Sequence, residues 1–136
     1  MSLSASSLSI GQEFRAVVVD GLTRTQIVQY AGASGDYNPL HTDERFATEI
    51  AGYPTVFAHG MLTMGLTARL VTDTVGDGRL TNYGVRFVKQ VWPGDTLTAT
   101  ATVTGVRGGE VDLEVTTVNQ SGDTVLTGTA TAKIDP

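Results

Sequence analysis

The stretch HGMLTMGLTARLVTDTV, residues 59–75, decides the fold of this chain. Its apolar residues recur at helical spacing and spread around much of the circumference, which predicts a long and deeply buried helix. Ahead of it, residues 12–19 are rich in β-formers and predict a first strand. Two helical segments are expected between the strand and the long helix, one capped by Thr25 and a shorter one capped by Thr42.

Beyond residue 76 the apolar period changes to two, which is typical of strands. Four further strands are predicted there, at residues 80–92, 96–106, 110–118 and 126–134. Gly108 and Gly109 predict a hairpin, and the out-of-phase Val118 predicts a bulge. Helices on one face of an antiparallel sheet make an α+β architecture, in which small inward residues let the sheet curve around the central helix. Such a layer leaves a sheet edge and an open flank, so we expect a dimer.

Composition narrows the classes of function. The length of 136 residues fits one domain, and 40% hydrophobic with 17% charged residues indicates a globular one. The nine Lys and Arg are scattered and the net charge is −5, which argues against nucleic acid. No apolar run approaches the roughly 18 residues of a membrane span. The lack of cysteine removes thiol catalysis and thiolate metal sites, and it is compatible with the cytoplasmic location that we expect.

The segment YAGASGDYNPLH, residues 30–41, holds one of only two histidines. Asp36 and His41 are five residues apart, and Pro39 prevents one continuous helix through both. The chain must turn between them, which can aim a carboxylate and an imidazole at one water molecule. The alternative is a structural turn in which Asn38 caps a short helix that starts at Pro39. Both interpretations remain open on the residues alone.

A second informative stretch is FAHGML, residues 57–62. Gly60 falls at the start of the predicted long helix, where the first N–H groups lack internal partners and the helix dipole is positive. A glycine at this point lets a substrate oxygen approach the backbone closely. An acid–base pair beside such an oxyanion site suits proton chemistry next to a carbonyl group.

The stretches YAGASGDYNPLHTD and FAHGML resemble the MaoC-like family, which comprises (R)-specific enoyl-CoA hydratases and related 3-hydroxyacyl-thioester dehydratases. The first is its specific hydratase 2 motif, and VRFVKQVWPGDTL is similar to the strand and turn that follow the central helix of hotdog folds. The resemblance covers almost the whole chain. It implies one hotdog domain over residues 1–136, with about residues 1–8 flexible. It also implies a homodimer with substrate in a tunnel near the interface, and neither a metal nor a redox cofactor.

By position in the motif, Asp36 and His41 match the catalytic dyad of the family. The resemblance implies that they activate water for addition at C3 of a trans-2-enoyl thioester, or dehydrate a (3R)-hydroxyacyl thioester. Asn38 matches the residue that supports the dyad, and the backbone N–H of Gly60 matches the donor to the thioester carbonyl. Ser34 lies in the motif and is expected to add a hydrogen bond. The implied substrate is an acyl-CoA or acyl-carrier-protein thioester.

Two other functions are weighed against this one. A hotdog thioesterase usually carries its carboxylate on the central helix, and here the predicted helix has none before Asp73. A subunit of a heterodimeric dehydratase would need a partner chain. We expect His59 to be structural, bonding backbone near the helix start, and Met61, Met64 and Leu66 to belong to the core.

Overall fold

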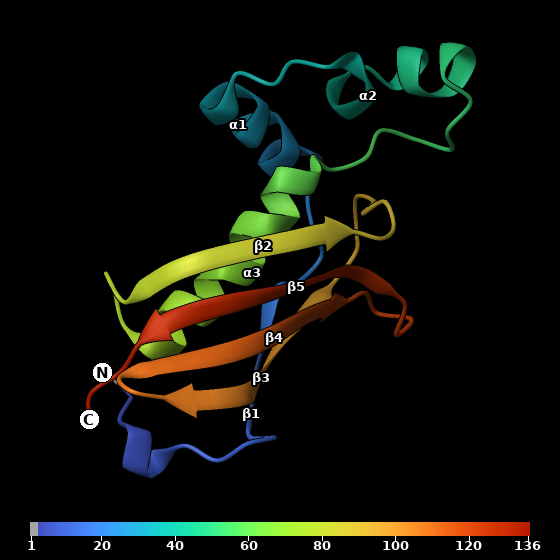
Figure 1. Cartoon of the computed structure of the whole chain (residues 1–136). Helices are drawn as coiled ribbons and strands as arrows, with labels where there is room; N and C mark the ends of the chain where they lie inside the picture. The colour runs from blue at the N-terminus through green and yellow to red at the C-terminus, as the bar shows by residue number, and fades with distance from the viewer. Residues whose placement is uncertain (1–2) are drawn as a thin grey trace.

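The structure is a computed structural model and describes residues 3–136. Its body is a five-stranded antiparallel sheet, in the order β1-β3-β4-β5-β2, with β1 and β2 at the edges (Figure 1). The strands are β1 (Glu13–Val19), β2 (Leu80–Phe87), β3 (Leu97–Arg107), β4 (Glu110–Val118) and β5 (Thr124–Lys133). Along the chain, the helices and turns are η1 (Ala5–Ser7), α1 (Arg24–Ser34), α2 (Pro39–Thr42), the π-helical turn η2 (Phe46–Ile50) and α3 (Gly60–Val75).

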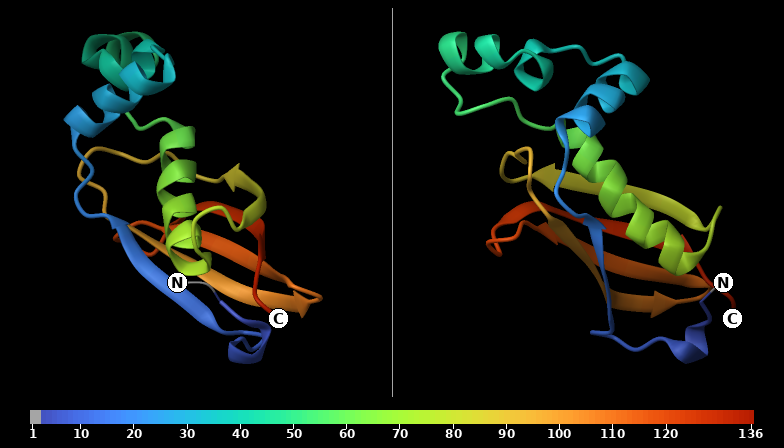
Figure 2. Two further views of the ribbon diagram at one scale, coloured as in Figure 1. Left: turned by 90° about the vertical axis from the view of Figure 1, so that its left-hand side faces the viewer. Right: turned by 180° about the vertical axis from the view of Figure 1, so that it is seen from behind.

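The helix α3 lies against one face of the sheet, which curves around it (Figures 1 and 2). The predicted inward row of β3 is fully buried, and it begins with Leu97 followed by Ala99 and Ala101. Small side chains at these positions allow the strands to approach the helix closely. The expected α+β architecture, a long helix wrapped by an antiparallel sheet, is therefore confirmed.

Residues 24–56, here called the helical cap, contain α1, α2 and η2. The cap lies beyond the N-terminal end of α3, away from the sheet (Figure 2). Arg24 joins its two ends, because its guanidinium pairs with Glu44 and donates to Thr55 Oγ1 at 2.8 Å. Hydrogen bonds from Thr55 and then from Arg24 lower the pKa of the Glu44 carboxyl. The cap is thus a tied unit and not a loose loop.

Two expected helix caps are wrong by one or two residues. Thr23, and not Thr25, caps α1, since its Oγ1 accepts from the N–H of Gln26 while Gln26 accepts from the N–H of Thr23. This reciprocal pair satisfies two donors, which a cap at Thr25 would not. In the second segment Asp43, and not Thr42, accepts from the N–H of Phe46 at 3.2 Å.

The edge strand β2 ends at Phe87, although the alternating pattern predicted a strand as far as Trp92. The ladder with β5 stops there because Val88 and Lys89 both donate to one carbonyl of β5, and the chain beyond them bonds the segment before α3. The N–H of Val88 donates to Val125 O at 2.9 Å, and Val91 O accepts from the N–H of Ala58 at 2.8 Å. The other strands follow the prediction, including a register shift between Thr117 and Val118.

The helix α3 is amphipathic in a way that the sequence did not reveal. Its buried residues include Thr63, Thr67 and Leu70, whereas Met61 is 56% exposed. Met61 was expected in the core, and that expectation is wrong for the single chain. Met64 and Leu66 do pack against the core. No helix within residues 3–136 is long and apolar enough to cross a membrane.

The first described residues lie beside the C-terminal residues of the chain. Ser4 forms a parallel bridge with Asp135, and Ala5 donates to Asp135 O at 2.9 Å. The expectation of a flexible segment over about residues 1–8 falls partly on Met1 and Ser2, which lie outside the described residues. That expectation remains a prediction.

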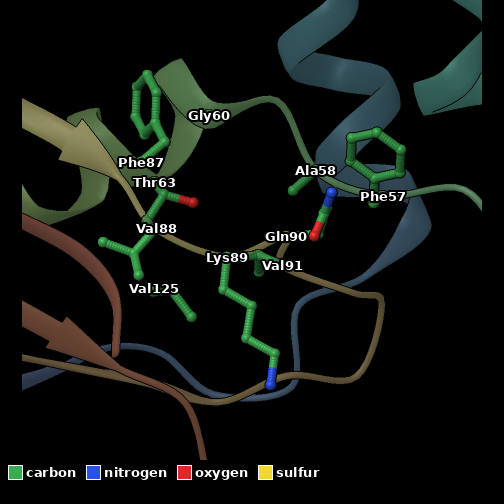
Figure 3. A pocket seen from close by; sticks show the side chains of 10 residues that line it. All are labelled: Phe57, Ala58, Gly60, Thr63, Phe87, Val88, Lys89, Gln90, Val91 and Val125. Atoms are coloured by element: carbon green, nitrogen blue, oxygen red, sulfur yellow. The ribbon is translucent and has the colours of Figure 1, made fainter. Parts of the chain in front are cut away.

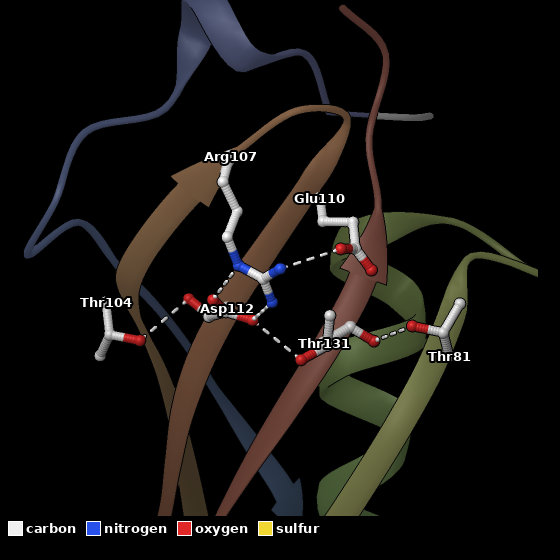
Figure 4. Close-up of polar contacts among 6 residues, drawn as sticks. All are labelled: Thr81, Thr104, Arg107, Glu110, Asp112 and Thr131. Atoms are coloured by element: carbon white, nitrogen blue, oxygen red, sulfur yellow. Dashed lines mark hydrogen bonds and ion pairs between the residues drawn. The ribbon is translucent and has the colours of Figure 1, made fainter.

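A polar cluster fastens the hairpin between β3 and β4 (Figure 4). Arg107 donates to both carboxylate oxygens of Asp112 at 2.9 Å and to Glu110 at 3.1 Å. Asp112 also accepts from Thr131 of β5 at 2.9 Å, which ties the hairpin to the next strand. Because Arg107 bonds this carboxylate twice, the pKa of Asp112 is lowered.

Candidate active site

The loop between α1 and α2 is built by local turn chemistry. The helix α1 ends at Gly35, whose φ of 75° lies in the left-handed region that glycine tolerates. Asn38 Oδ1 accepts from the N–H of Leu40 at 3.0 Å and caps α2, which starts at Pro39. Capping by Asn38, which the structural alternative expected, is therefore observed. This turn places His41 in α2, where its side chain faces the start of α3.

Asp36 is held by bonds from both sides of the turn. Its N–H donates to Ser34 Oγ at 3.1 Å, and its Oδ1 accepts from the N–H of Asn38 at 3.2 Å. Ser34 therefore supplies a hydrogen bond, as expected, and Asn38 contacts the carboxylate through its backbone. The Asp36 side chain itself remains exposed to solvent within one chain.

The His41 ring is fixed by a backbone carbonyl. Its Nδ1 lies 2.6 Å from Phe57 O, and because a carbonyl only accepts, Nδ1 carries the proton. In the neutral ring Nε2 is then free to accept a proton. Burial lowers the pKa of His41, and nearby His59 lowers it further, against opposing effects of Phe57 O and Asp36. At neutral pH His41 is thus an uncharged base.

His59 belongs to this cluster as well, which the sequence reasoning missed. It is 2% exposed, and its ring stacks on His41 with centroids 3.8 Å apart and planes 24° apart. The Nε2 of His59 donates to Asp36 O at 3.0 Å, so it does bond backbone as expected, but on the Asp36 loop. Its buried Nδ1 has no partner within residues 3–136. The only sequence signal was its place directly before Gly60.

Asp36, His41 and His59 each offer a donor atom, and these atoms lie within 4.8 Å of one another. Such a trio raises the question of a metal ion. Lone pairs of an imidazole lie in the ring plane, so two stacked rings direct theirs side by side, whereas metal ligands must converge on one point. One nitrogen of each ring is also engaged by a backbone carbonyl. The arrangement fits proton transfer better than coordination.

Gly60 is the first residue of α3, as predicted, and His59 is its N-cap. A cavity of about 270 Å³ opens beside it (Figure 3), lined by the segment before α3, by residues 87–91 and by Thr63 and Val125. A Cβ atom at Gly60 would come within 3.1 Å of the Phe87 ring. The glycine therefore leaves room for Phe87 and keeps the backbone accessible from the cavity.

The site thus combines the loop of residues 36–41 with the start of α3 at Gly60. A carboxylate and a neutral imidazole meet at one place, and the N-terminus of a 16-residue helix lies next to them. The helix terminus favours developing negative charge. This combination is suited to moving protons beside a carbonyl group, with Asp36, His41 and Gly60 as the candidate groups.

Comparison with known proteins agrees with this geometry. The family model described as MaoC like domain matches residues 5–125. The (R)-specific enoyl-CoA hydratase of Aeromonas caviae is 32% identical over 136 residues, which covers 97% of this chain and 99% of that protein. The 3-hydroxyacyl-thioester dehydratase Y of Mycobacterium tuberculosis is 40% identical over 82 residues, which cover 58% of this chain. The same alignment spans only 28% of the length of that dehydratase.

Among solved structures, the unliganded R-hydratase PhaJ1 of Pseudomonas aeruginosa superposes with a TM-score of 0.86 at 25% identity, covering 98% of this chain and 86% of that one. The hotdog fold implied by the resemblance is thereby confirmed. Because the family model matches most of the chain, this chain belongs to the MaoC-like domain family.

Proposed function

We propose that this chain adds water to trans-2-enoyl thioesters with (R) specificity and catalyses the reverse dehydration of (3R)-hydroxyacyl thioesters. The observation that carries the proposal is the meeting of Asp36 with His41 beside the N-terminus of α3. It is supported by the near full-length similarity to the Aeromonas caviae hydratase.

In this mechanism a water molecule sits between the Asp36 carboxylate and His41 Nε2. The dyad takes one proton from the water as its oxygen bonds to C3. The electron pair of the double bond moves toward the thioester carbonyl oxygen, which the Gly60 N–H holds. A proton is then returned to C2, which completes the addition of water. No electrons are gained or lost overall, so the proposal includes no redox cofactor.

The geometry supports this function over the two alternatives. The first carboxylate on α3 is Asp73, which lies 13 residues or about 20 Å along the helix from Gly60. That is too far to reach a thioester held there, which argues against the thioesterase. The heterodimeric alternative is not favoured either, because one chain supplies Asp36, His41 and the helix terminus.

We further propose a homodimer in which a second copy covers the exposed apolar side chains near the site. Met61 is 56% exposed, and Phe87 and Val88 at the end of the edge strand β2 are 53% and 57% exposed. The exposed Asp36 would be shielded from bulk water in the same assembly. The proposal extends to a cytoplasmic enzyme that takes CoA or acyl-carrier-protein thioesters.

The test follows the loss of enoyl absorbance with crotonyl-CoA and octenoyl-CoA. The wild type is expected to form the (3R)-hydroxyacyl product, and Asp36→Asn is expected to lose activity while remaining folded. Release of free CoA would instead indicate a thioesterase. Light scattering on the same sample gives the oligomeric state, and a monomer that is fully active would contradict the homodimer.

A further inference from the structure

The inner face of α3 carries a run of buried threonines where aliphatic side chains would be expected. Thr63 is 3% exposed and Thr67 is fully buried, one turn farther along the helix. Thr67 Oγ1 lies 2.6 Å from Thr117 Oγ1 of β4, so its hydroxyl is paired. Thr63 precedes this pair on the same face and lines the cavity beside Gly60.

The Thr63 hydroxyl differs from those of two other helical threonines. Thr48 and Thr74 bond the carbonyl oxygen four residues earlier, at 2.9 and 2.7 Å. In the part of the chain that the structure describes, Thr63 Oγ1 has neither such a bond nor another protein partner. Figure 3 shows the hydroxyl directed into the cavity. This hydroxyl lies at the surface of the cavity, where water or a ligand can supply the hydrogen bond that the described chain does not.

The cavity has one end that is open to solvent and one that is enclosed. Lys89 and Gln90 are exposed, and Lys89 pairs with Asp123 at 2.7 Å, so this side is the mouth. Val91 and Val125 are 4% and 1% exposed and form the enclosed walls. CoA or a carrier protein is too large to be enclosed and must leave through the mouth. The enclosed part, which includes Thr63, is therefore left for the acyl group.

Spacing along α3 sets which part of the acyl group reaches Thr63. Three residues separate it from Gly60, which amounts to about 4.5 Å along the helix axis. Three bonds of an extended chain cover about 3.8 Å. With the thioester carbonyl at the Gly60 N–H, the Thr63 hydroxyl lies close to C4 and C5 of the acyl chain.

We propose that Thr63 selects acyl groups that carry an oxygen substituent, such as a keto or hydroxyl group, at C4 or C5. This inference rests on the proposed function for the placement of the thioester. A plain alkyl chain would displace water from the hydroxyl and leave it unpaired, whereas an oxygenated chain replaces the lost hydrogen bond. Sites built to bond a polar substrate group discriminate against analogues that lack it.

Binding of saturated thioesters tests the proposal without any turnover. Calorimetry would compare hexanoyl-CoA with 4-oxohexanoyl-CoA and 5-oxohexanoyl-CoA. The wild type is expected to bind at least one oxo compound tenfold or more tightly than hexanoyl-CoA. Thr63→Val keeps the volume without the hydroxyl and should abolish the preference, while Thr63→Ser should retain it.

Equal affinity of the wild type for all three ligands, or no binding of any, would overturn the proposal. So would a preference that survives Thr63→Val. If Thr63→Val lost the same factor of affinity for all three ligands, the contact of Thr63 would lie at the thioester carbonyl or the CoA arm instead. Hydration of crotonyl-CoA is measured in parallel. A binding preference without hydration would refute the proposed reaction and still support the selective role of Thr63.

Discussion

The rings of His41 and His59 lie stacked, with their centroids 3.8 Å apart. Each ring also donates to a backbone carbonyl, His41 to Phe57 O and His59 to Asp36 O. His59 therefore touches the imidazole of the proposed dyad by its face and the loop of the carboxylate by its edge. The structure thus joins the two members of the proposed dyad through a third residue.

Substitution of His59 should expose this positioning role. His59→Phe keeps a flat ring for stacking but removes the bond to Asp36 O, and we expect kcat to fall by about 10- to 100-fold with little change in KM, because small misplacements of reacting groups are costly. His59→Gln provides a donor without the stack and serves as the matched variant. Steady-state kinetics on folded protein measures both. Unchanged kcat in His59→Phe would show that the Asp36 loop holds its position unaided.

The pH dependence of kcat/KM should report the environment of His41. Burial lowers its pKa below the ordinary 6.5, and the proposed reaction needs the neutral ring. Activity should therefore stay level as pH falls to about 6.5 and decline only below that, with the midpoint at the lowered pKa. The free energy of unfolding should also fall as pH drops below 6.5, because the unfolded chain takes up the His41 proton before the folded chain does.

Circular dichroism at each pH separates the two effects on activity. A loss of activity that precedes any loss of structure would be assigned to protonation of the dyad. An acid limb with its midpoint above pH 6.5 would contradict the neutral, desolvated His41 described above.

The elements with strong periodicity were the ones that the sequence predicted well. The alternation in residues 96–106 reflects one buried face, so the pattern and the fold agree there, whereas the helical spacing in residues 59–75 predicted the helix but not which of its faces is buried. The end of β2 could not be predicted from the apolar pattern, because it depends on Val88 and Lys89 sharing one carbonyl of β5 and on Val91 O accepting from the N–H of Ala58. That competition between partners is tertiary and leaves no local signal.

The candidate site was predictable in part for the same reason. Asp36, Asn38 and His41 lie within six residues, so turn chemistry alone indicates that they meet. His59 lies 18 residues beyond His41, and its ring orientation depends on packing against His41 and Tyr30. The free hydroxyl of Thr63 was hidden likewise, because a threonine in a helix most often bonds its own backbone.

Gly60 should tolerate no side chain without loss of activity. In Gly60→Ala the new methyl would press on the Phe87 ring from 3.1 Å and cover the proposed N–H donor. We expect kcat/KM to fall by about 100-fold, the size seen when one oxyanion donor is lost. Gly65→Ala in the same helix is the control, since nothing lies within 4 Å of its added Cβ. That control should keep full activity and gain about 0.5–1 kcal/mol of stability.

The buried pair of Thr67 and Thr117 should show strong coupling in a double-mutant cycle. Both side chains are 0% exposed, and their hydroxyls lie 2.6 Å apart across the interface between α3 and β4. Thr67→Val alone leaves the Thr117 hydroxyl buried and unpaired, which should cost about 1–3 kcal/mol of unfolding free energy, and Thr117→Val should act alike. The double variant replaces both hydroxyls by methyl groups of similar shape and should recover most of that loss.

Urea unfolding of the four proteins measures the coupling, and Thr63→Val, which breaks no hydrogen bond within the described chain, is the matched control. Additive losses in the double variant would mean that each threonine acts separately, through its own packing and not through the shared bond.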